Sequence, residues 1–154
     1  MQKLRILIAD DDPITVVLLQ SLLARWGYQE VVVARDGEEA RTLLRNGGIH
    51  ICILDWEMPR LNGRDLCWWI KSAELAPRPY VIMHTVHSSP EHVRTGYAAG
   101  ADDYLTKPMD RDDLRYRLAA HALKVLRLDA EQNELGDFDP LDLYRKDLHY
   151  QEAH

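Results

Sequence analysis

Several short stretches of the sequence end an apolar run with a side chain that can do chemistry. These side chains are the carboxylates of Asp10, Asp11, Asp12 and Asp55, the hydroxyl of Thr85 and the ammonium of Lys107. Asp55 closes the run ICIL (residues 51–54), which is apolar on both faces. A charged group at the end of a buried segment costs free energy unless something pairs with it. The sequence therefore predicts a partner for Asp55 among residues elsewhere in the chain.

The reacting side chains meet only if the runs before them are parallel strands of one sheet. The expected strands cover residues 4–9, 31–34, 49–54, 80–84 and 104–106. The segments between them have helical periodicity over residues 13–26, 38–45, 63–73 and 89–100, and a last helix begins at residue 110. Five strands that alternate with five helices predict an α/β fold, with a doubly wound parallel sheet covered on both faces. In such sheets, ligands gather at the carboxyl ends of the strands.

The first expected helix has clear end signals. Asp12 is suited to cap it, Pro13 is suited to its first turn, and Gly27 stops it. Apolar residues recur inside it at helical spacing, and we expect them to form its apolar face: Ile14, Val17, Leu18 and Leu22.

The predicted edge has the composition of a metal and phosphoryl site. Carboxylates gathered there would raise each other's pKa unless a cation lay among them. Oxygen ligands without His or Cys suit a hard ion such as Mg²⁺. The hydroxyl of Thr85 and the ammonium of Lys107 are partners that a phosphoryl group needs. The constellation predicts Mg²⁺ and a phosphoryl group on Asp55, with aspartyl phosphate as the covalent species.

The order of these motifs resembles the receiver domain of the two-component response-regulator family. The resemblance covers residues 4 to about 125 and rests on the segments ILIADDDP, ILDWEMPRLNG, HT and GADDYLTKP, one at each strand end. It implies a flavodoxin-like receiver fold with strand order 2-1-3-4-5. It also implies a phosphoacceptor signalling module, not an enzyme acting on a separate substrate. Its phosphoryl donor would be a histidine kinase or a phosphotransfer protein.

The resemblance also implies a role for each residue at the metal site. Asp55 would be the phosphoacceptor and, together with Asp11, a carboxylate ligand of Mg²⁺. Asp10 would act on the ion through water. The backbone carbonyl of Glu57 would be a further ligand.

The residues that would hold the phosphoryl group and respond to it are also implied by the resemblance. Thr85 and Lys107 would bind the phosphoryl oxygens, and the rotamer of Tyr104 would follow Thr85. Pro108 resembles the cis proline of the family, which would aim Lys107 inward.

Two positions beside Thr85 depart from the family pattern. Val86 stands where the family usually has a small residue, and it would crowd the path to Asp55. His84 stands where an apolar strand residue is more usual. Neither change removes a reacting group. We therefore expect both to affect the rates of phosphoryl transfer and not whether the transfer can occur.

Composition narrows the class of protein. The formal charge is −6 and no basic run is present among the 154 residues, which argues against a nucleic-acid surface in this chain. Cys52 and Cys67 lack CxxC spacing and are expected to be buried free thiols, which fits a reducing compartment. The sequence has no signal peptide and no run of membrane-spanning length, so we expect a cytoplasmic protein.

The chain is expected to divide into a receiver domain, residues 1–125, and a helical C-terminal extension, residues 126–154. The last helix can continue through Leu135, and Asp139-Pro140 resembles the start of a new one. The extension is too short for a helix-turn-helix reader. The segment DPLDLYRKD resembles the start of a diguanylate cyclase domain. The extension is therefore either a truncated linker to an absent output domain or the tail of a stand-alone receiver.

The resemblance also suggests a homodimer through the fourth helix, the fifth strand and the fifth helix. Asp102 and Asp103 would pair there with Arg115 and Arg117 across a symmetric interface. Surface pairs are weak singly, so the expected dimer is weak and salt-sensitive.

Other classes of protein share parts of this pattern. A phosphatase with an aspartate nucleophile also uses Mg²⁺, but its D-x-D-x-T motif lies on the first strand, whereas Asp55 lies on the third. A nucleotide-binding flavodoxin-like module would need a glycine-rich phosphate loop after the first strand. A pseudo-receiver would lack reacting groups that are present here.

Overall fold

The computed structural model describes the backbone of residues 4–133 and the side chains of residues 4–126. Five parallel strands form one sheet in the order β2-β1-β3-β4-β5, as predicted. The strands are β1 (Arg5–Ala9), β2 (Glu30–Ala34), β3 (Ile51–Leu54), β4 (Tyr80–Thr85) and β5 (Asp103–Thr106). The helices are α1 (Pro13–Arg25), α2 (Gly37–Arg45), α3 (Gly63–Ser72), α4 (Pro90–Ala99) and α5 (Arg111–Asn133).

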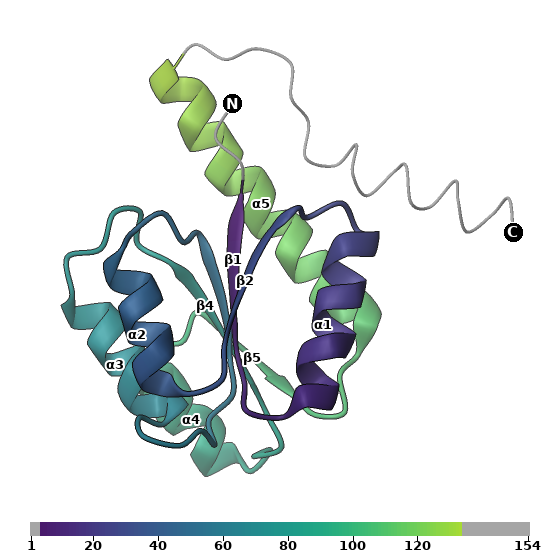
Figure 1. The fold of residues 1–154 in the computed structure, drawn as a ribbon, viewed down its shortest axis with the longest axis vertical. Helices are drawn as coiled ribbons and strands as arrows, with labels where there is room; N and C mark the ends of the chain where they lie inside the picture. Colours follow the sequence, from purple (N-terminus) through teal and green to yellow (C-terminus); the bar gives the residue numbers. More distant parts are fainter. Residues whose placement is uncertain (1–3, 134–154) are drawn as a thin grey trace, which may run out of the picture.

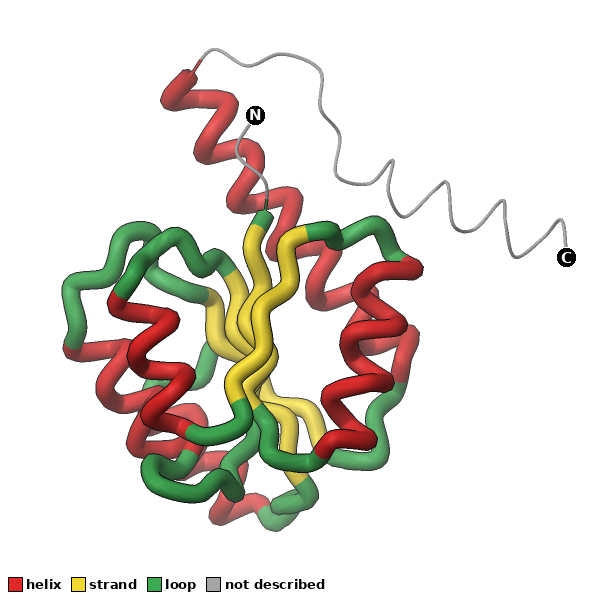
Figure 2. Tube along the Cα trace, viewed as in Figure 1, coloured by secondary structure: helices red, strands yellow, loops and turns green. Residues whose placement is uncertain are grey.

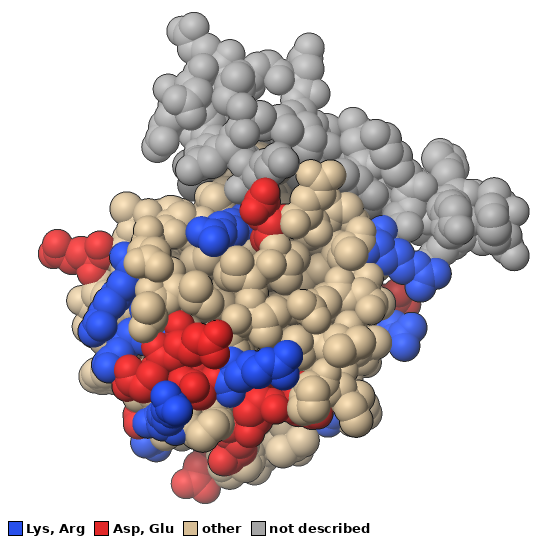
Figure 3. Space-filling view, viewed as in Figure 1, with Lys and Arg blue, Asp and Glu red and all other residues tan. Residues whose placement is uncertain are grey.

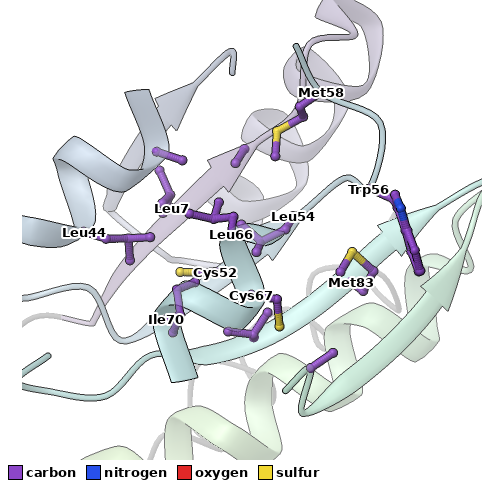
Figure 4. Close-up of a cluster of buried hydrophobic side chains, with 14 of the residues drawn as sticks. Leu7, Leu44, Cys52, Leu54, Trp56, Met58, Leu66, Cys67, Ile70 and Met83 are labelled. Carbon is purple, nitrogen blue, oxygen red and sulfur yellow. The ribbon is translucent and has the colours of Figure 1, made fainter. Parts of the chain in front are cut away.

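The helices lie in two layers, so the sheet is buried on both faces. Helices α1 and α5 cover one face, and α2, α3 and α4 cover the other (Figures 1 and 2). One core, formed by side chains such as Ile8, Ile53 and Leu118, lies under α1 and α5. The other core lies under α2 to α4 and includes both free thiols, Cys52 and Cys67, which are buried as predicted (Figure 4).

The cap predicted for α1 is present, and α4 also begins at a capping residue. The side chain of Asp12 accepts a hydrogen bond from the amide of Ile14, and Pro13 is the first residue of α1. Ser89 caps α4 in the same way. Gly100 ends α4 with a φ of 114°, a left-handed conformation that glycine adopts without steric cost.

The predicted apolar face of α1 was partly wrong. The side chains that α1 buries are Val16, Leu19, Leu22 and Leu23. Ile14 and Val17 are 78% and 60% exposed. The helix is apolar on almost every side before Arg25, so helical spacing alone does not distinguish the buried stripe from its neighbour.

Helix α5 is longer than the sheet requires. It continues past the amino end of the sheet (Figure 1), and its described part runs to Asn133. The second helix expected from Asp139 lies outside the described residues. Among residues 4–133, no helix is both long and apolar enough to cross a membrane.

Candidate functional site

The carboxyl ends of the strands carry the predicted acids and the lysine. Backbone pairing continues one residue beyond β1 and β3, because the amide of Asp10 donates to Ala34 O at 3.1 Å and that of Asp55 donates to Ala9 O at 2.8 Å. The pairing fixes where these side chains project. Figure 3 shows Asp and Glu side chains gathered toward the lower end of this view, where β1 leads into α1 in Figure 1.

Three of the predicted metal-site residues come together as a triad. Asp10, Asp11 and Asp55 each offer a carboxylate oxygen within 4.8 Å of the others, and this is the only group of three or more candidate ligands among the described residues. Asp10 and Asp55 are buried, whereas Asp11 is exposed. Burial raises the pKa of Asp10, although hydrogen bonds from the Asp12 amide and Lys107 oppose the rise. An oxygen-only set with one open side fits Mg²⁺.

Lys107 lies inside the triad as predicted. Its ammonium donates to Asp10 Oδ2 at 3.0 Å and to Asp55 Oδ2 at 3.1 Å. Burial alone would lower the pKa of Lys107, but the hydrogen bonds to the two carboxylates raise it. The lysine therefore stays charged and supplies the partner that a buried Asp55 needs. The peptide bond before Pro108 is cis, as predicted.

Thr85 and Tyr104 both contact the backbone of His87. Thr85 is fully buried, and its hydroxyl accepts a hydrogen bond from the amide of His87 at 3.3 Å. The hydroxyl of Tyr104 donates to His87 O at 2.6 Å, and its ring lies against Gly96. A Cβ at position 96 would come within 2.8 Å of that ring. The absence of a side chain on Gly96 is what lets the ring lie inward.

The β4–α4 loop is tied to the β3–α3 loop by a contact that sequence reasoning missed. His87 Nε2 lies 2.7 Å from Glu57 Oε1. The ring of His87 stacks on that of His92, with centroids 4.4 Å apart, and both meet Trp56 edge-on. Thirty residues separate Glu57 from His87, so no local pattern links them. The side chain of Glu57 thus contacts the β4–α4 loop beside the site, and this contact is separate from the metal-ligand role that the resemblance implies for its backbone carbonyl.

The two departures beside Thr85 have opposite surroundings. Val86 is 63% exposed, so it does not pack sideways against α4. His84 is buried, and neither of its ring nitrogens has a hydrogen-bond partner among the described residues.

The expected pairing of arginines at the α4-β5-α5 face needs one correction. Arg115 does not lie there: it is buried, and its guanidinium lies over the ring of Trp26 at 5.8 Å. Arg117 does lie at this face, where it forms an ion pair with Asp103 of the same chain. Asp102 accepts a hydrogen bond from the amide of Val81 at 2.8 Å. The reason is helical geometry, because residues two apart on a helix point about 200° apart.

Comparison with known proteins decides the family. Residues 6–119 match the response regulator receiver domain. The chain belongs to this family. As a receiver domain it is a phosphoaspartate signalling module and not a classical enzyme, and receiver domains are phosphorylated by histidine kinases.

Relatives of the receiver domain differ in length. The transcriptional regulatory protein YvrH of Bacillus subtilis is 32% identical over 121 residues, which are 79% of this chain and 50% of that protein. The chain spans about half the length of the first curated relatives it matches. Chemotaxis protein CheY1 of Helicobacter pylori is 31% identical over 116 residues, which are 75% of this chain and 94% of CheY1.

A solved receiver structure bears on the metal. The receiver domain of the sensor histidine kinase PA1611 from Pseudomonas aeruginosa PAO1 has a TM-score of 0.70 and 25% identity, covering 77% of this chain and 96% of that one. It has a magnesium ion coordinated in its active-site cleft. In the present receiver, Asp10, Asp11 and Asp55 form an acidic triad whose oxygen atoms are suited to such an ion.

Proposed function

We propose that Asp55 accepts a phosphoryl group from a histidine kinase or phosphotransfer protein and that the phosphoryl group switches partner or output-domain interactions. The observation that carries the proposal is the contact of the Lys107 ammonium with both Asp10 and Asp55 inside the acid triad. A carboxylate held beside a fixed cation and a metal site is a nucleophile positioned for phosphoryl transfer.

In this proposal the metal is held by the carboxylates of Asp11 and Asp55, by Asp10 through water and by the backbone carbonyl of Glu57. When bound, Mg²⁺ neutralises charge on the phosphoryl oxygens. A carboxylate oxygen of Asp55 forms the new bond to phosphorus while the bond from phosphorus to the donor nitrogen breaks. The electron pair of that bond leaves with the imidazole of the donor.

Thr85 and Lys107 would hold the phosphoryl oxygens, and Thr85 and Tyr104 would carry the signal. In this structure the His87 amide donates a hydrogen bond to the Thr85 hydroxyl, and the carbonyl of His87 accepts a hydrogen bond from the Tyr104 hydroxyl. When the Thr85 hydroxyl turns to bind a phosphoryl oxygen, it gives up its hydrogen bond with the His87 amide. Because Tyr104 is bonded to the carbonyl of the same residue, the β4–α4 loop and Tyr104 change conformation together.

Intact mass measurement tests the proposal. Acetyl phosphate and Mg²⁺ should add one phosphoryl mass to the wild-type chain, and Asp55→Asn should abolish the addition. Asp12→Asn is the matched control, because asparagine still caps α1 and the reacting groups remain. A phosphoryl mass that persists in Asp55→Asn would overturn the assignment.

The partner surfaces belong to the same proposal. Ile14 and Val17 leave an apolar stripe on α1 beside the acid triad, which supports docking of the phosphoryl donor there. The α4-β5-α5 face is a candidate homodimer surface. We keep residues 1–125 as the receiver and residues 126–154 as an extension or linker, and we propose a cytoplasmic location, which the two buried free thiols support.

A further inference from the structure

His84 is a buried polar side chain without a hydrogen-bond partner beside the phosphorylation site. It is 3% exposed, and both ring nitrogens lack a partner among the residues that the structure describes. Nearly all buried polar groups in native proteins are partnered, because leaving one unsatisfied costs free energy. An orphaned imidazole at this place therefore calls for a function.

The sheet register sets His84 directly beside Asp55. Leu54 on β3 lies opposite Met83 on β4, so the next pair across these strands is Asp55 and His84. Neighbouring strands are about 4.8 Å apart. The two residues are therefore adjacent across the sheet.

Asp55 and His84 also project to the same face of the sheet. Side chains alternate along a strand, and Ile53 and Ile82 both belong to the core under α1 and α5. The residues two positions further on, Asp55 and His84, share that face. Leu105 belongs to the same core, which sets Lys107 on this face too.

The side chain of Lys107 crosses the position of His84. Lys107 comes from the end of β5, and its ammonium reaches Asp55 after β3 and Asp10 after β1. Strand β4 lies between β5 and β3, so the lysine passes over the end of β4. His84 is the residue of β4 that projects to this side there.

The imidazole of His84 has an N–H donor in either protonation state. Burial lowers its pKa to about 4, and the nearby Lys107 lowers it further while Asp55 opposes. A neutral imidazole has one N–H donor and one acceptor nitrogen. In the unphosphorylated chain the Lys107 ammonium donates a hydrogen bond to Asp55 Oδ2. The N–H donor of His84 therefore makes no hydrogen bond in this state.

We infer that His84 donates a hydrogen bond to the carbonyl oxygen of phosphorylated Asp55 and thereby shortens the lifetime of the phosphoaspartate. The inference rests on the proposed function, in which Lys107 turns from Asp55 to the phosphoryl oxygens. Its turning frees an oxygen of Asp55 beside the imidazole.

The chemistry sets the direction of the effect. In hydrolysis the oxygen of a water molecule bonds to phosphorus, and the bond between phosphorus and the Asp55 oxygen breaks. The electron pair of that bond returns to Asp55 as a carboxylate, and the proton of the water leaves to solvent. A donor that faces this carboxyl group stabilises the charge that develops on it.

The test uses the full chain, acetyl phosphate and Mg²⁺. His84→Leu should lengthen the phosphoaspartate lifetime about fivefold to tenfold, the effect of one hydrogen bond. His84→Gln keeps an N–H donor and should stay near the wild-type lifetime. Met83→Leu is the matched packing control, since Met83 is buried on the opposite face of the same strand. His84→Met serves as a second apolar variant if the leucine variant fails to fold.

Infrared absorption of the phosphoaspartate carbonyl gives a readout that altered packing would not move. The carbonyl band should shift to higher frequency in His84→Leu and return toward the wild-type position in His84→Gln. Equal lifetimes and equal bands in wild type and His84→Leu, with one phosphoryl mass added to both, would overturn this inference and leave the proposed function standing. A wild-type chain that takes up no phosphoryl mass would overturn both.

Discussion

Side chains at the carboxyl edge of the sheet are of two kinds: those that react, and those that control how a phosphoryl donor or water approaches Asp55. Asp55 and Lys107 are in contact, and Asp10 and Asp11 complete the charge cluster around them. Val86 stands at the open side of this cluster, with its side chain 63% exposed. The reacting groups decide whether the phosphoryl group can be held, and the exposed side chain affects how fast it arrives and leaves.

We expect Val86→Ala to speed both phosphorylation by acetyl phosphate and loss of the phosphoryl group. Valine adds two methyl groups and has a stiff χ1, so it does not swing aside for an in-line donor or water. A barrier lower by about 1.4 kcal/mol would appear as roughly tenfold in each rate. Intact mass against time measures both rates.

Val86→Ala should speed the loss of the phosphoryl group, whereas His84→Leu should slow it. Mg²⁺ affinity serves as the control and should change little. Rates equal to wild type, or slower rates with a lowered melting temperature, would show that Val86 supports the loop instead of obstructing the site.

His121 should make the domain less stable in acid. Its ring stacks on Tyr80 with centroids 3.8 Å apart, and burial, together with Lys124, lowers its pKa to about 4 from 6.5. The unfolded chain therefore binds a proton that the folded chain refuses, so the free energy of unfolding falls as pH drops from 6.5 towards 4. His121→Phe keeps the stack without the titration and should remove about 1 kcal/mol of this loss.

Urea unfolding at several pH values in this range measures the His121 effect. Tyr80→Phe is the control for disturbance of the stack, because it leaves His121 in place. The same pH slope in His121→Phe and wild type would contradict the assignment.

At the level of elements, contacts between loops add to the strand pairing that positions the site. The β3–α3 loop approaches α2 so closely that a Cβ on Gly37 would overlap the carbonyl of Leu61. The same loop reaches the β4–α4 loop through Glu57 and His87. Its one backbone departure is Arg60, the only non-glycine residue with a positive φ (71°) among the described residues.

Arg60→Gly should stabilise the domain by up to about 1 kcal/mol. A non-glycine residue in the left-handed region carries steric strain that glycine lacks, and the greater freedom of glycine in the unfolded chain offsets part of the gain. The side chain of Arg60 is mostly exposed and lies 3.8 Å from Asp36, a pair of little worth. Denaturant unfolding measures the change.

Arg60→Ala is the matched variant, since it removes the charge and keeps the strained backbone. A gain in the alanine variant equal to that in the glycine variant would point to the charge and rule out strain as the cause.

At the scale of the whole molecule, the edge strand β5 and its flanking helices α4 and α5 form a surface that is connected to the site through Tyr104. Tyr104 links the two, since its hydroxyl reaches the loop after Thr85 and its ring lies near that of the exposed Tyr97. Asp103 and Arg117 are already paired within one chain, so this pair is not free to tie two copies together.

We expect any homodimer through this face to be weak, to form more readily with a phosphoryl mimic bound and to dissociate at high salt. Charges that pair across an exposed surface contribute little and are screened by ions. Sedimentation at low and high salt, with and without the mimic, measures the association. A monomer at every protein concentration and in both states would argue against this surface.

The sequence by itself determined the α/β fold, its parallel sheet and the reacting residues Asp55, Thr85 and Lys107 as candidates, whereas the strand order was implied by the family resemblance. It did so because two periodicities suffice to distinguish strands from helices, and because parallel strands bring their carboxyl ends to one edge. The capping residues Asp12 and Ser89 also act locally, so their signals stand in the sequence itself.

Only the tertiary structure decided which apolar side chains of α1 are buried, where Arg115 points and which residues meet around the site. Ile14 is as apolar as the side chains that α1 buries, and only packing against the sheet separates them. The contact of Glu57 with His87 joins two loops that are distant in sequence, and so does the adjacency of Asp55 and His84. Such contacts depend on register and on how layers pack, and no local pattern of residues encodes them.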